Sequence, residues 1–445
     1  MKKFLISFAE KLHLLIFGHK MSDQMRGFLG NLSWSFYGGI LSMPITIAVG
    51  TLAGRFMGPE QYGKYNLVIL VSTYIIALSF FGLDISTIKN VAKAKTKEQK
   101  QRSFFSSFVF VSLVTSVFLA LMLIFRQKIS SDFGLDMRIV ISVVIYTVVV
   151  TCKLMLDILT RALEQFKLQA ISRFIEIAVL ALGFSAAVFL YHKIDFEIFL
   201  AIILSGAALV SLVYFAYLRS YFRHFSFATL RLQLAEGKFF MLSSILGTIF
   251  ISSDRLLIAK YIGVSALGIY SAYYAASLAL VTGLSLILTN VLLPATARTD
   301  DKSFVLKIDK LCIKGFIPIY LLICAAIFIF LNLFGKAYPL KLSYVLLFAL
   351  IATIYFFQTV YNIVILDATR RRYVQYFLVS NVINLVNIAY YFVILKYVSK
   401  SIDLMLIGFA LNVILTLLLQ IIITRKMIKE ASVQTEMSLG DSMVK

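Results

Sequence analysis

Two oppositely charged residues stand side by side within a long apolar stretch. Asp254 and Arg255 follow the start of residues 239–262 by about fifteen residues, or roughly two-thirds of a membrane crossing at about 1.5 Å per residue. Charges at that depth are costly unless they face a cavity or a partner. We expect this pair to line a binding cavity. The structural alternative is that both residues bond to neighbouring helices.

A second set of charges follows helical spacing. Lys153, Asp157 and Arg161 occupy positions i, i+4 and i+8, which predicts a ladder of ion pairs on one helix face. Structural pairing accounts for Asp157 and Arg161. Lys153 lies deeper, where its ammonium group would suit an anionic head group that approaches from the cytoplasm, and both roles remain open for it.

Weaker candidates lie on other apolar segments. Asp84 and Glu176 lie toward the cytoplasmic ends of their helices, where a hydrated surface position is favoured over coupling to protons or cations. Asn290 and Asn362 are amide groups that could contact sugar hydroxyls. Bonding between helices is the safer assignment for most of the asparagines.

Catalytic and metal motifs are missing from the sequence. Residues 58–64 match the phosphate-binding pattern G-x-x-x-x-G-K, but Tyr65 follows where a magnesium-binding Ser or Thr is required, and no strand precedes the segment. The three cysteines are widely spaced in apolar segments, and no H-E-x-x-H or G-x-S-x-G motif occurs. We therefore predict no catalytic residues, no metal site and no enzyme activity.

The composition explains which elements must position these residues. Apolar residues make up 60% of the 445 residues and charged residues 15%, too little polar surface for a soluble protein of this size. The net charge of +21 resides mainly in short loops between apolar segments, so the sequence does not indicate nucleic-acid binding. The sequence predicts an all-α integral membrane protein.

Apolar windows of membrane-spanning length predict about twelve transmembrane helices. Lys and Arg concentrate in alternate loops together with both termini, and the positive-inside rule then places both termini in the cytoplasm. The predicted helices are 31–54, 66–88, 104–125, 139–157, 173–191, 197–218, 239–262, 269–295, 311–334, 342–366, 377–397 and 403–423.

The chain carries an internal repeat. Gly58, Gly63 and Tyr65 recur 205 positions later as Gly263, Gly268 and Tyr270, with similar residues between them. Six helices per half give both halves the same orientation, which is the parallel-repeat arrangement of secondary transporters. We interpret the glycines themselves as positions of tight turns and close helix contacts.

These observations define five segments. We predict a cytoplasmic amphipathic segment, an N-terminal lobe of helices one to six, a cytoplasmic linker, a C-terminal lobe of helices seven to twelve and a cytoplasmic tail. Their bounds are 1–28, 29–218, 219–238, 239–423 and 424–445.

The two repeated segments also resemble a known family. Residues 55–65 after the opening Asn31–Trp34, and residues 253–263 with 266–270, are similar to the polysaccharide transporter family of bacterial flippases. This family belongs to the superfamily of multidrug, oligosaccharidyl-lipid and polysaccharide exporters. The resemblance implies two six-helix lobes, as in multidrug and toxin extrusion proteins, around a cationic cavity. Asp254 and Arg255 match the family motif, so the resemblance makes both of them candidate substrate-binding residues.

The resemblance implies a function as well. The expected activity is to flip an undecaprenyl-pyrophosphate-linked oligosaccharide, a unit of O-antigen, capsule or exopolysaccharide, across the bacterial inner membrane by alternating access. The alternative is a cation-coupled multidrug exporter, but the deep Lys153 and Arg255 favour an anionic substrate. No cofactor is expected, and protons or sodium are the candidate coupling ions. Candidate partners are membrane lipids and a polysaccharide polymerase or other assembly proteins, without nucleic acid.

Overall fold

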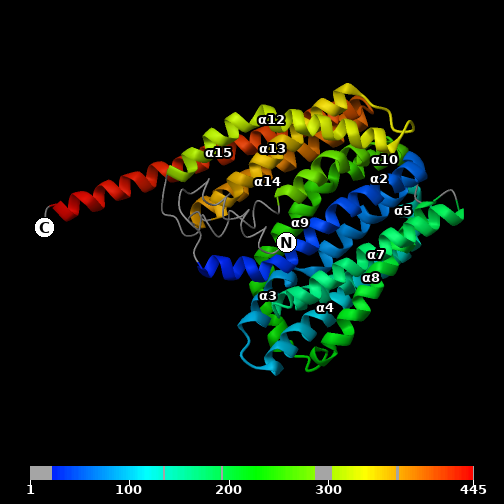
Figure 1. Ribbon diagram of the computed structural model, residues 1–445, viewed down its shortest axis with the longest axis horizontal. Helices are drawn as coiled ribbons and strands as arrows, with labels where there is room; N and C mark the ends of the chain where they lie inside the picture. The colour runs from blue at the N-terminus through cyan, green and yellow to red at the C-terminus, as the bar shows by residue number, and fades with distance from the viewer. Residues whose placement is uncertain (1–22, 134–135, 192–193, 286–302, 367–369, 444–445) are drawn as a thin grey trace. The chain divides into compact units, whose positions relative to one another are not determined.

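The computed structural model consists of long helices (Figure 1). It describes residues 23–133, 136–191, 194–285, 303–366 and 370–443, and throughout these ranges the chain forms helices, turns and short connections without β-strands. The predicted amphipathic segment 1–28 lies almost entirely outside the described residues. The all-α prediction is confirmed.

The helices follow the chain in a simple order. In the first part of the chain they are α2 (Asp23–Phe80), α3 (Leu83–Lys93), α4 (Lys97–Ile124), α5 (Arg126–Phe133), α6 (Met137–Ala162), α7 (Phe166–Tyr191), α8 (Phe196–Leu218), η1 (Arg219–Tyr221) and α9 (Phe227–Tyr261). They continue as α10 (Val264–Tyr274), the π-helical turn η2 (Ala275–Ala279), α12 (Ser303–Phe334), α13 (Leu342–Leu366), α14 (Arg370–Val393), the π-helical turn η3 (Ile394–Val398) and α15 (Ile402–Met443).

The described residues include 11 helical segments long and apolar enough to cross a membrane. One of them, Ser42–Phe80, has 39 residues and contains Gly58, whose φ of 71° and ψ of 172° interrupt the helix. This segment is therefore two consecutive membrane helices. The prediction of about twelve transmembrane helices is confirmed.

The second predicted helix, 66–88, is wrong at its cytoplasmic end. The chain turns at Phe81 and Gly82, which have φ values of 50° and 72°, and a separate helix, α3, begins at Leu83. A Cβ at Gly82 would overlap the backbone carbonyl oxygen of Gly237 on α9. The absence of a side chain thus permits both the left-handed turn and the close backbone approach.

The predicted linker 219–238 is also largely helical. Residues from Phe227 onward belong to α9, which continues without a break into the seventh membrane span. Ser226 caps the helix by accepting a hydrogen bond of 3.3 Å from the backbone N–H of Thr229. The buried Leu230 and Gln233 attach this cytoplasmic part of α9 to the helices around it.

Hydrogen bonds between polar side chains hold α9 against α3 and α4. The amide of Gln233, which is fully buried, donates to Ser103 Oγ at 2.8 Å and accepts from Ser107 Oγ at 3.1 Å. Near the membrane surface, Asn90 on α3 donates to Glu236 on α9 at 2.8 Å. The α9 segment is therefore attached through specific contacts.

The described residues through Ser271 form one compact unit, and those from Ala272 form another. In the first unit, Phe104, Leu156, Leu159 and Tyr214 belong to a core between α3, α4, α6, α8 and α9. In the second, a smaller core surrounds Phe357 and Tyr361. The division into lobes around 219–238 stays a prediction, and α9 packs on α2, α3 and α4 in the first unit.

Candidate functional site

The repeated glycines occupy equivalent positions in the backbone. Gly58 and Gly263, 205 residues apart, both have positive φ values, of 71° and 126°. Each ends one membrane helix immediately before the next begins, and few other residues adopt such angles without strain. The interpretation of these glycines as turn residues is confirmed.

The second glycine of each repeat makes a reciprocal contact. A Cβ at Gly63 would overlap the carbonyl oxygen of Val264, and a Cβ at Gly268 would overlap the carbonyl oxygen of Pro59. Because Val264 and Gly268 follow Pro59 and Gly63 by the same 205 residues, each repeat segment contacts the other through equivalent positions. This is the pattern of a self-complementary interface around a two-fold axis, here within one chain and inside the first compact unit.

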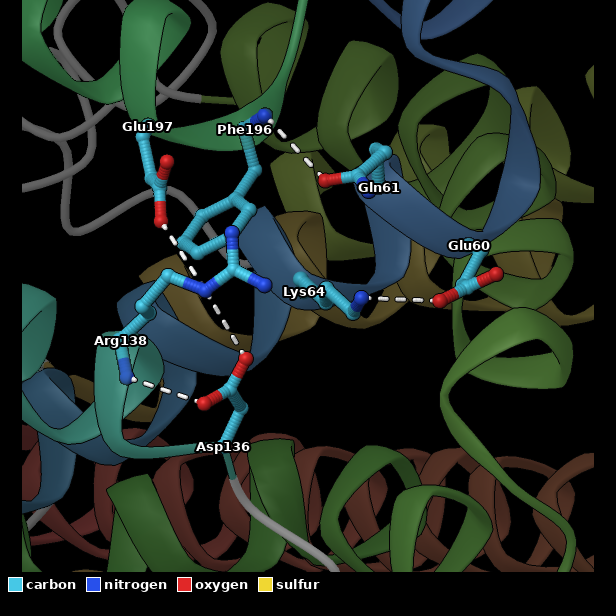
Figure 2. Close-up of polar contacts among 7 residues, drawn as sticks. All are labelled: Glu60, Gln61, Lys64, Asp136, Arg138, Phe196 and Glu197. Atoms are coloured by element: carbon cyan, nitrogen blue, oxygen red, sulfur yellow. Dashed lines mark hydrogen bonds and ion pairs between the residues drawn. The ribbon is translucent and has the colours of Figure 1, made fainter.

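The G-x-x-x-x-G-K match is part of a helix. From Pro59 onward the chain is helical, and Lys64 forms an ion pair of 2.8 Å with Glu60 one turn earlier (Figure 2). Gln61 accepts a hydrogen bond of 3.5 Å from the backbone N–H of Phe196 at the start of α8. The segment therefore offers a helix surface and no phosphate-binding loop.

Beside this turn, a cluster of charges joins α6 to α8 on the predicted outer face. Arg138 Nε lies 3.0 Å from Asp136 Oδ2 and 3.8 Å from Glu197 Oε1 (Figure 2). Asp136 also caps α6 by accepting a hydrogen bond of 3.4 Å from the Arg138 backbone N–H. The backbone and side-chain hydrogen bonds from Arg138 lower the pKa of Asp136 below its usual value. These three side chains are well exposed and fix the helix ends in place.

Asp254 and Arg255 occupy different environments on α9. The Asp254 carboxylate is buried, and its Oδ2 accepts a hydrogen bond of 2.5 Å from the hydroxyl group of Tyr270 on α10. Its Oδ1 accepts no hydrogen bond and lies 3.9 Å from Nε of Arg255. The structure thus supports the bonded alternative for Asp254, whereas a role of either residue in a binding cavity stays a prediction.

The surroundings of this pair are polar for a membrane interior. The Arg255 guanidinium donates to Ile251 O at 3.4 Å and to Ser252 Oγ at 3.3 Å, on the preceding turn of α9. Tyr74 on α2 lies within electrostatic range of both charges. The Arg255 side chain is 19% exposed, so its charge is not fully enclosed by protein.

The ion-pair ladder predicted along α6 does not form. Lys153 instead pairs with Glu176 on α7, and Asp157 accepts a hydrogen bond of 2.8 Å from the hydroxyl group of Tyr214 on α8. Arg161 is exposed at the cytoplasmic end of α6. The prediction failed because partners on neighbouring helices compete with those one turn away. Glu176, assigned to a hydrated surface from the sequence, is the partner of Lys153 and is 30% exposed.

The weaker candidates fall into separate places. Asp84 lies half-buried in the first turn of α3, where the N-terminal end of the helix favours a negative charge. Asn362 on α13 accepts a hydrogen bond of 2.8 Å from the amide of Gln420 on α15, which also donates to the Tyr376 hydroxyl oxygen at 2.9 Å. This is the helix-to-helix role favoured for most asparagines. Asn290 lies outside the described residues.

The side chains that commonly bind metal ions are dispersed in the described residues. Within the described ranges, no three His, Cys, Asp or Glu side chains come together in a group that could hold a metal ion. Cys152 lies on α6, whereas Cys312 and Cys324 lie on α12.

Comparison with solved structures identifies the fold. An inward-facing multidrug resistance transporter of the MATE family is 15% identical in sequence, with a TM-score of 0.60 over 88% of this chain and 95% of the other. An outward-facing MATE transporter gives 0.58 at 14% identity, over 91% and 96%. A transporter of the MOP superfamily from Pyrococcus furiosus gives 0.51 at 14% identity, over 90% and 95%. At these identities the likeness shows the shared fold alone.

Sequence comparison identifies the family. No curated protein sequence matches this chain. The family model of the polysaccharide biosynthesis proteins matches residues 28–300, which is more than half of the chain and includes both repeated segments. The chain therefore belongs to the polysaccharide biosynthesis protein family and is a multi-pass membrane protein.

Proposed function

We propose that this protein flips an undecaprenyl-pyrophosphate-linked oligosaccharide across the bacterial inner membrane by alternating access. The family match over residues 28–300 is the observation that carries the proposal, because it links a transporter fold to polysaccharide synthesis. Such a substrate cannot cross unaided, since its ionised phosphates and sugar hydroxyls would lose their hydration in hydrocarbon.

The distribution of cations within the membrane spans supports an anionic substrate. Lys153 on α6 and Arg255 on α9 are only partly buried, with side chains 18% and 19% exposed. Each can bring a positive charge to a phosphate group, and a guanidinium group can bind it through two hydrogen bonds. A related transporter from Pyrococcus furiosus is described by the reverse polarity of its binding pocket, so pockets of different charge occur on this fold.

The reciprocal glycine contact supports alternating access. The repeat ends meet at Gly63 with Val264 and at Gly268 with Pro59, on the predicted outer face. We infer that these contacts form in the inward-open state and separate when the substrate is released outward. The lipid tail stays in the bilayer during this cycle while the glycan and its pyrophosphate cross. The drug-exporter alternative is less favoured, because the family match is to polysaccharide biosynthesis proteins.

The test uses cells that make a surface polysaccharide through this protein. The gene for this protein is deleted, and the cells are then supplied with the wild type, Lys153→Ala or Arg255→Ala. Membrane expression of each form is checked, so that a defect in transport can be separated from a defect in synthesis. Loss of surface glycan together with accumulation of the lipid-linked intermediate on the cytoplasmic side supports the proposal. Unchanged glycan together with greater sensitivity to cationic drugs on deletion would refute it.

A further inference from the structure

The ion pair between Lys153 on α6 and Glu176 on α7 has features of a selective anion site. We propose that Glu176 makes this site selective. Its carboxylate pairs with Lys153, and only a lipid with two phosphate charges can displace the carboxylate from the lysine. Lipids with a single phosphate charge would then be excluded. This inference rests on the proposed function, and it specifies how the same transporter rejects ordinary anionic phospholipids.

Both side chains lie away from the exposed apolar faces of their helices. On α6 the exposed apolar residues Ile141, Ile145 and Val148 lie on average about 110° from Lys153, at about 100° per residue. On α7 the corresponding residues lie on average about 120° from Glu176. These residues are Ile171, Phe174, Leu182, Phe189 and Leu190, of which Leu190, at the end of the helix, lies about 40° from Glu176.

The pair is nevertheless not enclosed by protein. The Lys153 side chain is 18% exposed and that of Glu176 is 30% exposed. Since the exposed part of the pair lies away from the exposed apolar faces of α6 and α7, the proposed site opens to a hydrated space at this point. An anionic head group could therefore reach the lysine without leaving water.

Glu176 is well placed to compete with such a ligand. Asp157, one helical turn from Lys153, accepts a hydrogen bond of 2.8 Å from Tyr214 on α8. For Lys153, the carboxylate contact that the structure records is the one to Glu176. Removing the charge of Glu176 therefore removes the competitor while the lysine stays in place.

The number of negative charges on the lipid then determines whether it replaces Glu176 as the partner of Lys153. A phosphodiester carries one negative charge, the same as Glu176, so exchange gains little electrostatic energy. A lipid-linked pyrophosphate carries a charge on each of two phosphates, and the additional charge makes exchange favourable. Because singly charged phospholipids are abundant in membranes, such competition would keep the site open for the rarer substrate.

Two prenyl lipids of equal chain length provide the test, because they differ only in the phosphate group. Binding is measured on the purified full-length protein in uncharged detergent for two methyl esters, which are geranylgeranyl methyl phosphate as the monophosphate with one charge and the terminal methyl ester of geranylgeranyl diphosphate with two. We expect the wild type to prefer the diphosphate by about tenfold, an order of magnitude consistent with one additional charge near a partly hydrated lysine. Glu176→Gln should raise monophosphate affinity and reduce this preference to about threefold or less.

Matched variants separate selectivity from stability. Glu197→Gln removes one of the two carboxylate partners of an exposed arginine, Arg138, and should leave the preference unchanged. Lys153→Gln should abolish binding of both lipids, and Lys153→Gln combined with Glu176→Gln should behave in the same way. These results would support a site in which Glu176 acts through Lys153.

Other results would overturn the inference. An unchanged preference in Glu176→Gln, or an equal loss of affinity for both lipids, would assign Glu176 a structural role alone. If the wild type binds neither lipid, the inference fails as well. The proposed function is judged separately by the surface glycan and its intermediate in cells, so the two failures are distinguishable.

Discussion

The hydroxyl group of Tyr270 lies 2.5 Å from Oδ2 of Asp254, and this hydrogen bond joins α10 to α9 within the membrane. Both residues belong to the second repeat, where Tyr270 corresponds to Tyr65 in the first. Val49 stands 205 positions before Asp254, so the first repeat has no equivalent carboxylate. The two halves therefore differ chemically at a point where their sequences otherwise correspond.

Loss of the Tyr270 hydroxyl should destabilise the protein. Tyr270→Phe leaves the buried Asp254 carboxylate without its hydrogen-bond donor, at a cost of about 1–3 kcal/mol. The midpoint of thermal unfolding in detergent should fall by several degrees. Tyr397→Phe is the matched control, because Tyr397 is 68% exposed. Equal midpoints for the two variants would show that this hydrogen bond contributes nothing to stability.

The reciprocal glycine contact should not tolerate side chains. Gly63→Ala and Gly268→Ala each introduce a Cβ that overlaps a backbone carbonyl oxygen, and we expect each to cost about 1–3 kcal/mol. Cells carrying either variant should show less surface glycan at equal membrane expression. In Gly50→Ala and Gly247→Ala the new Cβ meets no neighbouring atom within 4 Å, so these controls should retain wild-type levels. Wild-type glycan and stability in both contact variants would refute a required close approach.

The buried amide on α9 should be important for docking its cytoplasmic part. Gln233→Ala removes the hydrogen bonds to Ser103 and Ser107 on α4 and should cost about 1–3 kcal/mol. Hydrogen exchange of the backbone amides in residues 227–238 should become faster. Arg231→Ala, an exposed change on the same helix, should leave exchange unchanged. Equal exchange in the two variants would mean that apolar packing alone holds this segment.

The sequence predicted the number of membrane helices because each span carries its own apolar signal. It missed the break at Phe81–Gly82, since the apolar window continues through a turn that depends on contact with Gly237 of α9. It also assigned residues 227–238 to a linker. The cap at Ser226 and the apolar Leu230 were available as signals of a helix.

The role of the candidate residues in a binding cavity stays a prediction, but their partners can be compared with those expected from the sequence. Deep charges identified Asp254, Arg255 and Lys153, because their cost in hydrocarbon can be estimated without knowing their neighbours. Their partners Tyr270 and Glu176 could not be predicted in the same way. They lie 16 and 23 residues away along the chain, on other helices, and only the packing of those helices brings them into contact.

Translocation by the purified protein tests the central claim most directly. Proteoliposomes with a fluorescent undecaprenyl-pyrophosphate-linked oligosaccharide are treated with a membrane-impermeant glycosidase, and the fraction of lipid protected from cleavage is followed. We predict that the wild type makes the protected lipid accessible to the glycosidase. Lys153→Gln and Arg255→Gln, reconstituted in equal amounts, should do so at least about tenfold more slowly, as expected for the loss of one charge-assisted contact. Protection that persists with the wild type at the level of protein-free liposomes would contradict the assignment as a flippase.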